Sequence, residues 1–567
     1  MCVQMKYGHT FFIANYGLKR NHPWHLITNY TFRSKIPPIW YYFPPLLLDQ
    51  SLSLQRTSFK YTNMKSISLY TLTVCLFFIS CLAHTSCTQS VENDYEFALR
   101  YQNLPFDMPR IDRPQIPDYE ISLTDFGGIA DGKTLNTSAF AKAMNHLKNQ
   151  GGGRLVVPAG MWLTGPIEFE SNVELHVANG ALVIFSPDRS LYPIVKTSFE
   201  GLNTRRCMSP LTAINKENIA ITGHGSFNGN GQHWRPVKKM KTTENQWKKL
   251  CSSGAVNEKG NIWYPSERIR EVSEDRTFMA RAHATDDSLA WEYVHDFLRP
   301  VLLSFIGCKN ILLEDATFEN SPGWNIHPLM CENVILHRLN IRNPWYAQNG
   351  DGLDLESCRN ALILDCTFDV GDDAICIKSG KDKDGRERGM PTENVIIEGC
   401  TVYHGHGGFV IGSEMSGGAR CISVRRCVFI GTDTGLRFKS TRGRGGVVEK
   451  IYIDGINMYN IEGDAVTFDL YYGIKSGAPI PPVSEETPQF KDIYISHTTC
   501  QGAKRTMWFN GLPEMPIKNI VVSNSLFHGK SGAIINYVDG VTFENVSLEA
   551  ESGDPISQSN SIGIEIR

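Results

Sequence analysis

One sequence feature constrains the fold more than any other: a strand-like motif recurs along the C-terminal half of the chain. Most units open with a polar residue and continue with alternating apolar residues, as in NILLEDATF, NVILHRLNI and NALILDCTF. The units begin at residues 310, 333, 360, 394, 421, 450, 492, 519 and 540. The spacing between these starts, with one strand per unit, is typical of a solenoid. We predict an all-β, single-stranded parallel β-helix, because a β-sandwich would not explain the repeated opening.

Two segments depart from the repeat. SAFAKAMNHLKNQGGG, from Ser138, has the pattern of an amphipathic helix that Asn136, Thr137 or Ser138 can cap and Gly151 can end. It predicts a capping helix over the first open edge of the β-helix. Residues 232–300 form a charged, tryptophan-bearing and partly helical insertion. We expect this loop insertion to build a wall of a binding cleft, although a solvated excursion without a role has the same pattern.

The N-terminal part is different in composition. Residues 1–63 are aromatic and basic without a sustained period, and we interpret them as an upstream extension that is disordered, with an organelle transit segment as the alternative. Met64 then opens a segment with Lys65 and the apolar run ISLYTLTVCLFFISCLA. Residues 64–87 therefore have the pattern of a signal peptide, which predicts export to the periplasm, the outer membrane or the medium.

Two cysteines lie at the end of that segment. Either Cys81 or Cys87 is suitably placed for lipid attachment, so an outer-membrane lipoprotein and a freely secreted protein both remain open. Residues 88–118 are polar and proline-bearing, as a linker is, and the β-helix domain is predicted to span residues 119–567.

Charge and cysteine content exclude several classes. The formal net charge of −3 favours neither a nucleic-acid partner nor a polybasic membrane surface. Many of the 15 cysteines recur near repeat strands without zinc-type spacing. We expect buried free thiols, with one or two disulfides left open. We also expect a monomer.

Acidic and basic residues recur at similar phase in successive units. Asp372 and His406 each lie 12 residues after the start of their unit, and Asp351 and Arg437 lie somewhat further along theirs. Adjacent coils of a parallel β-helix are about 4.8 Å apart, so residues at equal phase are neighbours. We therefore predict that these four residues and Asp373 lie along one face.

Clustered carboxylates repel one another, which raises the pKa of one of them and supplies a general acid beside general bases. Hydrolysis of a glycosidic bond needs this pair. Arg437 and Lys439 are two residues apart on one strand and point the same way, so they suit a substrate carboxylate. The residues predict hydrolysis of an acidic polysaccharide. A calcium site is the competing use of three aspartates, but interleaved cations oppose it, so we expect no metal and no cofactor.

The sequence resembles the polygalacturonases and related pectin hydrolases of glycoside hydrolase family 28. NGDGLD from Asn349 resembles the family's Asn-Thr-Asp motif with Gly350 in place of threonine, GDD matches outright, and HGHGG and RFK resemble its Gly-His-Gly and Arg-Ile-Lys motifs. The resemblance covers residue 119 to the C-terminus, and its motifs, each short, occur in the family's order.

The resemblance implies a right-handed, pectin-lyase-like β-helix and an inverting hydrolase. It assigns Asp372 as general acid, Asp351 and Asp373 as the groups that activate water, and His406 as a support for the acid. Asn349, Arg437, Lys439 and one of the two tyrosines of FDLYYG, Tyr471 or Tyr472, would bind substrate, with Tyr471 taken as the first candidate.

The implied substrate is a galacturonan of the plant cell wall or its oligosaccharides. GSEMSGG and RGRGG resemble segments of bacterial exo-acting members, which favours exo-polygalacturonase over endo-polygalacturonase. A rhamnogalacturonan hydrolase is an alternative in the same family. From other classes, a pectate lyase and a non-catalytic glycan-binding β-solenoid also remain open.

Overall fold

The computed structural model describes residues 97–474 and 479–567. The predicted extension (1–63) and signal peptide (64–87) lie outside the described residues. Within the described ranges, none of the helices has the length and hydropathy needed to cross a bilayer.

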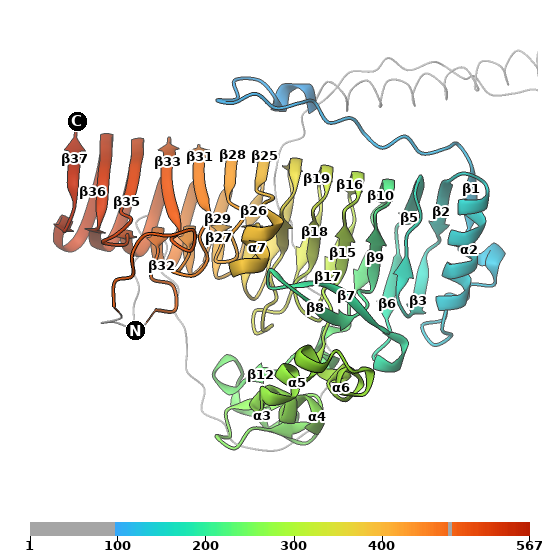
Figure 1. Ribbon diagram of the computed structural model, residues 1–567. Helices are drawn as coiled ribbons and strands as arrows, with labels where there is room; N and C mark the ends of the chain where they lie inside the picture. The colour runs from blue at the N-terminus through green and yellow to red at the C-terminus, as the bar shows by residue number, and fades with distance from the viewer. Residues whose placement is uncertain (1–96, 475–478) are drawn as a thin grey trace, which may run out of the picture. The chain divides into compact units, whose positions relative to one another are not determined.

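The strands form three faces in which every neighbouring pair is parallel (Figure 1). The face that matters for function contains β4 (Ile167–Glu168), β9 (Leu211–Ile214), β15 (Leu303–Ile306), β18 (Ile326–Leu329), β21 (Leu353–Glu356), β24 (Asp373–Lys378), β27 (Gly407–Ile411) and β30 (Thr434–Lys439). It continues through the long strands β32 (Asn457–Asp469), β34 (Thr499–Asn510), β35 (Ile517–Asn536) and β36 (Val538–Ser559). The predicted right-handed parallel β-helix is confirmed.

The other two faces complete each coil. One contains β1 (Glu120–Ser122), β2 (Gly153–Val157), β5 (Val173–Val177), β10 (Glu217–Thr222), β16 (Lys309–Glu314), β19 (Glu332–His337), β22 (Arg359–Leu364), β25 (Thr392–Glu398), β28 (Ala419–Arg425), β31 (Val447–Asp454) and β33 (Gln489–Ser496), and ends at β37 (Ile562–Ile566). The other contains β3 (Gly160–Thr164), β6 (Ala181–Phe185), β11 (Ser226–Asn228), β17 (Thr317–Glu319), β20 (Asn340–Arg342), β23 (Thr367–Asp369), β26 (Thr401–Val402) and β29 (Val428–Ile430).

The repeated polar opening of each unit has a backbone cause. All nine unit starts have positive φ, from +50° at Asn519 to +89° at Gly540. Asparagine tolerates this left-handed conformation better than most residues. The asparagine amides also bond from coil to coil: Asn360 donates to Asn333 at 3.2 Å, and Asn394 donates to Asn360 at 3.1 Å. The opening is therefore a turn that also joins the coils.

The interior of the coils is apolar. Side chains at one register stack through successive strands, as in Ile326, Leu353, Ile375, Phe409 and Leu436. The eleven cysteines of the described residues are free, and nine of them are buried. Eight of these nine fill core space as small apolar groups, as the sequence predicts, and Cys376 lies beside Asp373 on the functional face.

The first coil is closed by α2 (Thr137–Asn149), which confirms the predicted capping helix. Phe140, Ala143 and Leu147 are buried against the first strands. The predicted linker at 88–118 is described from residue 97 onward, and this part is packed rather than free. Phe97 and Ile111 are buried against Leu312, Ile335 and neighbouring residues on the outside of the second face.

The insertion predicted at 232–300 is a small subdomain beside the β-helix (Figure 1). It contains the antiparallel strands β12 (Val237–Lys238), β13 (Ala255–Val256) and β14 (Ile262–Tyr264) and the helices α3 (Glu244–Cys251), α4 (Glu267–Glu274), α5 (Thr277–Thr285) and α6 (Ser288–Tyr293). Trp234, Trp291 and Leu298 are buried in a core of its own. The hairpin of β7 (Ile194–Phe199) and β8 (Leu202–Cys207) contributes Cys207 to the same core region, and Tyr192, which precedes the hairpin, also packs there.

Candidate active site

The predicted polar residues do meet on one face of the β-helix. Asp373 begins β24 and is in register with Gly407 of β27, so Asp372 and His406 lie side by side on neighbouring coils. The next coil, in β30, brings Arg437 and Lys439. Asp351, Asp372 and Asp373, hereafter the carboxylate cluster, have oxygens within 4.8 Å of one another.

Asp373 is held as an anion. Its side chain is 2% exposed, Lys439 Nζ lies 2.6 Å from Oδ2, and Arg437 Nη1 lies 3.2 Å from Oδ1. Burial by itself would raise the pKa of Asp373, but the charges of Lys439 and Arg437 lower it below the usual range. The group is therefore an ionised carboxylate at neutral pH.

Asp351 is in the opposite situation. It is buried, and its Oδ1 has no hydrogen-bond partner among the described residues. Burial, followed by the charges of Asp354 and Asp372, raises the pKa of Asp351 well above its usual value. Two carboxyl groups of the cluster thus favour opposite protonation states.

Asp372 is the accessible member of the cluster, with 18% of its side chain exposed. His406 Nδ1 lies 3.0 Å from Asp372 Oδ1, and the backbone N–H of Asp373 donates to the same oxygen at 3.1 Å. The hydrogen bond with Asp372 raises the pKa of His406, although burial opposes the shift. A proton can therefore be kept on the Asp372–His406 pair near neutral pH.

The substitutions within the motifs have local explanations. A Cβ on Gly350 would come within 2.6 Å of Ala347 Cβ, so a larger residue does not fit this loop. Phe438 points inward between Arg437 and Lys439 and stacks on Phe468 at 4.4 Å between ring centroids. Alternation along β30 therefore buries the middle residue of RFK and presents both cations on the outer face.

Asn349 and the tyrosines lie on either side of the cluster. Arg299 donates from Nη2 to Asn349 Oδ1 at 2.6 Å and from Nη1 to the Gln348 carbonyl at 2.6 Å. The Tyr472 ring lies 5.2 Å from Lys439 Nζ and 5.9 Å from Arg437 Cζ. Tyr471 instead packs against Arg442, so the structure places Tyr472, and not the first candidate Tyr471, beside the site cations.

Sequence reasoning missed a buried layer next to the cluster. Lys378 Nζ lies 2.8 Å from Glu414 and 3.5 Å from Asp354, and Asp354 has no hydrogen-bond partner for either oxygen among the described residues. Burial raises the pKa of Asp354, while Lys378 opposes the shift. Side chains alternate between the inside and the outside along β21 and β24, and this alternation brings Asp354 and Lys378 to the functional face. The same pattern in the sequence could have predicted both residues.

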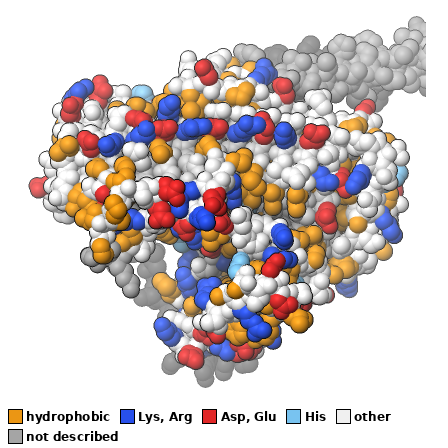
Figure 2. Space-filling model, viewed as in Figure 1, with side chains coloured by type: hydrophobic (Ala, Val, Ile, Leu, Met, Phe, Trp, Pro, Cys, Tyr) orange, Lys and Arg blue, Asp and Glu red, His pale blue; other side chains and the backbone are white. Residues whose placement is uncertain are grey.

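Residues of the insertion also approach the cluster and were not predicted. Lys241 donates from Nζ to the Trp345 carbonyl at 3.4 Å, on the loop that leads to Asn349. Burial lowers the pKa of Lys241, and the charge of Asp372 opposes this shift. Figure 2 shows charged side chains around the hollow between the insertion and the β-helix.

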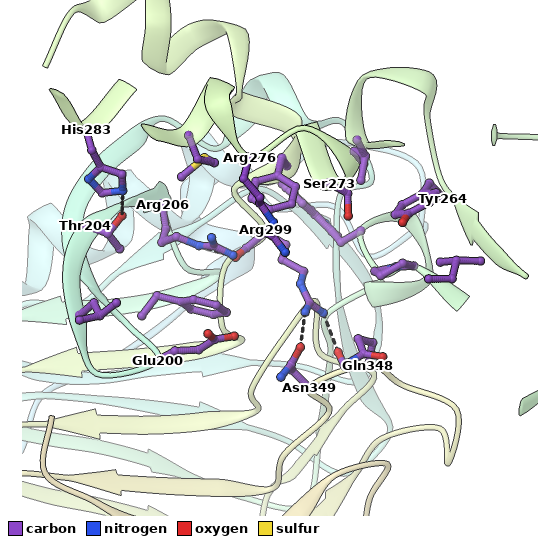
Figure 3. A pocket seen from close by; sticks show the side chains of 18 of the residues that line it. Glu200, Thr204, Arg206, Tyr264, Ser273, Arg276, His283, Arg299, Gln348 and Asn349 are labelled. Atoms are coloured by element: carbon purple, nitrogen blue, oxygen red, sulfur yellow. Dashed lines mark hydrogen bonds between the residues drawn. The ribbon is translucent and has the colours of Figure 1, made fainter. Parts of the chain in front are cut away.

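A cavity of about 700 Å³, hereafter the insertion cavity, lies in this region (Figure 3). Its walls come from the β7–β8 hairpin, the insertion and the loop that carries Gln348 and Asn349. The predicted cleft wall is therefore supported by a cavity that begins two residues before Asp351.

The carboxylate cluster also has the residue types of a cation site. Both oxygens of Asp373 already contact Lys439 or Arg437, which reduces what the cluster offers to a metal ion. The arrangement suits acid–base chemistry on a bound sugar better.

Comparison with known proteins supports this chemistry. The model for glycosyl hydrolases family 28 matches residues 296–539. A curated exo-poly-alpha-D-galacturonosidase of Dickeya chrysanthemi is 28% identical over 76% of this chain and 70% of its own length. A probable polygalacturonase of Vitis vinifera is 29% identical over 72% of this chain and 74% of its own length.

Among solved structures, a hyperthermoactive exopolygalacturonase of Thermotoga maritima superposes with a TM-score of 0.66 and 34% identity, and the match covers 78% of this chain and 95% of that one. The family-28 exopolygalacturonase of Yersinia enterocolitica, at 23% identity and a TM-score of 0.61, shares the fold. The protein described here is a glycoside hydrolase that belongs to family 28.

Proposed function

We propose that the protein hydrolyses α-1,4-galacturonosyl linkages of pectic galacturonan by acid–base catalysis and acts from a chain end. One observation carries the proposal. An ionised, ion-paired Asp373 lies beside the accessible Asp372–His406 pair on a β-helix face that also presents two cations. The names of the relatives, polygalacturonase and exo-poly-alpha-D-galacturonosidase, give the substrate class.

The geometry supports a division of roles. Asp372 reaches solvent and shares a hydrogen bond with His406, so it is the carboxyl group that can donate a proton to the leaving oxygen. Asp373 is held ionised, and Asp351 lies next to it, so these two can orient and activate a water molecule. Arg437, Lys439 and Tyr472 lie where they can bind the neighbouring galacturonate.

The stereochemical course follows from the surroundings of Asp373. Retaining glycosidases place their two carboxylates about 5–5.5 Å apart, and inverting ones about 6.5–9.5 Å apart. In the carboxylate cluster, single oxygens of Asp372 and Asp373 lie within 4.8 Å of each other, and this closest approach of two atoms does not by itself choose between the two courses. Asp373, however, is buried and engaged by two cations, so it is poorly placed to attack a sugar carbon. Water is the better nucleophile, and inversion to the β-anomer is expected in a proton NMR time course; an initial α-anomer would contradict it.

The insertion favours exo action. It lies beside the face at its N-terminal end and encloses the insertion cavity next to Asn349. Toward the C-terminus the same face continues through β32, β34 and β35. A groove closed at one end admits a chain terminus, whereas an endo-acting enzyme needs both directions free.

The product analysis tests this proposal against its alternatives. Purified protein is incubated with polygalacturonate, with and without a calcium chelator, and the products are separated. Galacturonate or a single short oligomer from the start means exo-hydrolysis, and mixed oligomers mean endo-hydrolysis. Products that absorb in the ultraviolet and disappear with chelator mean a lyase, and binding without release means a glycan-binding solenoid. Activity on rhamnogalacturonan alone would reassign the substrate.

Export, a lipid anchor and the monomeric state are further proposals that rest on the sequence. Membrane fractionation of cells expressing the full chain, with Cys81→Ala and Cys87→Ala variants, tests the anchor. A lipoprotein moves to the soluble fraction in one variant only.

A further inference from the structure

The insertion cavity contains arginine side chains that form no ion pair within the described part of the chain. Arg206, at the end of the β7–β8 hairpin, is 8% exposed, and Arg299 lies beside it. The acceptors of Arg206 and Arg299 among the described residues are carbonyl and amide oxygens, not carboxylates. Most buried charges in proteins are paired with an opposite charge. Arg276 and Lys238 also line the cavity, against the acids Glu200 and Asp384.

The guanidinium of Arg206 is held in place by Phe199 and by the carbonyl group of Arg299. Its guanidinium lies 3.8 Å from the centroid of the Phe199 ring, and its Nε and Nη2 both donate to the carbonyl oxygen of Arg299, at 3.1 and 2.7 Å. Its third nitrogen, Nη1, has no acceptor among the described residues. Burial and then the charge of Arg299 lower the pKa of Arg206, although Glu200 opposes the shift, which reflects the cost of holding this charge away from water. An anion at Nη1 would remove that cost.

Arg299 connects this arginine to the catalytic region. Its carbonyl accepts from Arg206, while its guanidinium donates to Asn349 and Gln348 (Figure 3). A sugar unit in the cavity would therefore lie next to the residues that precede Asp351.

The rest of the lining suits a pyranose ring. Phe297, Met279 and Ile262 are partly exposed and offer apolar surface for sugar C–H groups. Glu200, Asn203 and Thr204 offer polar atoms for hydroxyl groups. The combination of apolar walls, a few polar atoms and an unpaired guanidinium matches a carboxylated sugar rather than a neutral one.

We propose that Arg206, held by Phe199 and Arg299, binds the carboxylate of the terminal galacturonate of the substrate chain in the insertion cavity. The proposal rests on the proposed function, because it assumes that a galacturonan chain end enters this cavity. It makes Arg206 a specificity-determining residue: a chain whose terminal carboxyl group is esterified or reduced is a poor ligand.

Binding experiments without turnover test the site. Titration calorimetry with the Asp372→Asn protein compares trigalacturonate with two analogues, in each of which one terminal carboxyl group is reduced to the alcohol. The analogue that lacks the carboxyl group bound in the insertion cavity is expected to bind about 10- to 100-fold more weakly than trigalacturonate, as for a lost hydrogen bond to a charged group. Adding Arg206→Gln removes that difference, because it weakens trigalacturonate and the other analogue and leaves the analogue that already lacks the bound carboxyl group unchanged. Arg206→Lys keeps part of the preference, because it retains the charge but loses the planar fork.

Arg205→Gln is the matched control. Arg205 is adjacent on β8 but pairs with Asp286, away from the cavity, so its loss should leave the preference unchanged. Equal weakening of all three ligands by Arg206→Gln, a preference that does not depend on Arg206, or no binding at all overturns the proposal.

Hydrolysis by the wild-type protein is measured separately. If it releases no sugar but the binding pattern holds, the site stands and the proposed function falls. If it releases galacturonate but Arg206 does not affect the preference, the proposed function stands and this site falls.

Discussion

The carboxylate cluster and the insertion cavity lie side by side but handle charge in opposite ways. In the cluster, Lys439 and Arg437 neutralise Asp373, and His406 bonds to Asp372. In the cavity, Arg206 and Arg299 have no carboxylate partner among the described residues. The first region is organised for proton transfer before substrate arrives, whereas the second is completed by an anionic ligand. Removing a charge should therefore affect turnover and stability in the cluster, and ligand preference in the cavity.

The sharpest test of the cluster is Asp372→Asn. The amide cannot donate a proton to the leaving oxygen, so kcat should fall by about 10²- to 10⁴-fold, the usual contribution of general acid catalysis. Release of reducing sugar measures the effect. Asp369→Asn on the same coil is the control, because Asp369 pairs with the exposed His404 and lies outside the cluster. A fully active Asp372→Asn enzyme would refute the acid assignment.

Lys439→Met tests whether Asp373 is truly held by its cations. A buried carboxylate would lose one of its two partners, and breaking a buried pair costs about 3–5 kcal/mol; the remaining Arg437 places the expected loss near the lower end. Lys491→Met removes a partly exposed pair with Glu449 and should cost only about 0–1 kcal/mol. Denaturant unfolding at pH 7 compares the two variants.

The same pair predicts a pH dependence of unfolding. The folded-state pKa of Asp373 lies below its unfolded value of about 3.9. Its ion pairing therefore stabilises the fold above that pH, and the contribution is lost as pH falls through the folded-state pKa. The difference between wild type and Lys439→Met should shrink below about pH 4. A difference that stays constant down to acid pH would count against an ionised Asp373.

His406 should define the alkaline limb of the activity profile. The hydrogen bond with Asp372 raises the pKa of His406 above the ordinary value of about 6.5. His406 is therefore protonated at and below about pH 6.5 and loses its proton as the pH rises through the raised pKa. We expect kcat/KM to decline above neutrality and His406→Gln to remove this limb while lowering kcat/KM by about tenfold or more. An unchanged alkaline limb in His406→Gln would assign it to another group.

The smallest expected effect concerns Lys241, a residue of the insertion that acts on the carboxylate cluster. Lys241 belongs to the insertion, and its charge lowers the pKa of His406 in opposition to Asp372. Lys241→Met should shift the alkaline limb upward by a fraction of a pH unit and raise KM a few-fold, with little change in kcat. Lys259→Met, elsewhere in the insertion, is the control. If both variants behave alike, the insertion does not act on the cluster through Lys241.

Much of this site could be predicted because the β-helix repeats. The unit starts mark the left-handed turn, and residues counted from them fall at equal phase, which is why Asp372 and His406 proved to be neighbours. Tyr471 and Tyr472 could not be separated in this way, since both follow the last residue of β32, where alternation ends. Local turn geometry decided that Tyr472 lies beside Lys439.

The arginines of the insertion cavity could not be predicted, because they do not belong to the repeat. Arg206 and Arg299 are 93 residues apart and belong to no repeat unit. Lys241 lies in the insertion, and predicting helices there does not show how the insertion packs against the β-helix. Contacts between irregular segments depend on the packing of Trp234, Trp291 and their neighbours, which no periodicity encodes.

Coil spacing turns sequence phase into distance, so the β-helix, its capping helix, the order of the polar residues along one face and the family to which they point could all be predicted from the sequence. Three properties could be found only in the folded protein: which carboxylate is neutralised, which tyrosine lies beside the cations and what the insertion encloses. Those properties depend on burial and on unpaired charge, and both arise only when separate segments pack together.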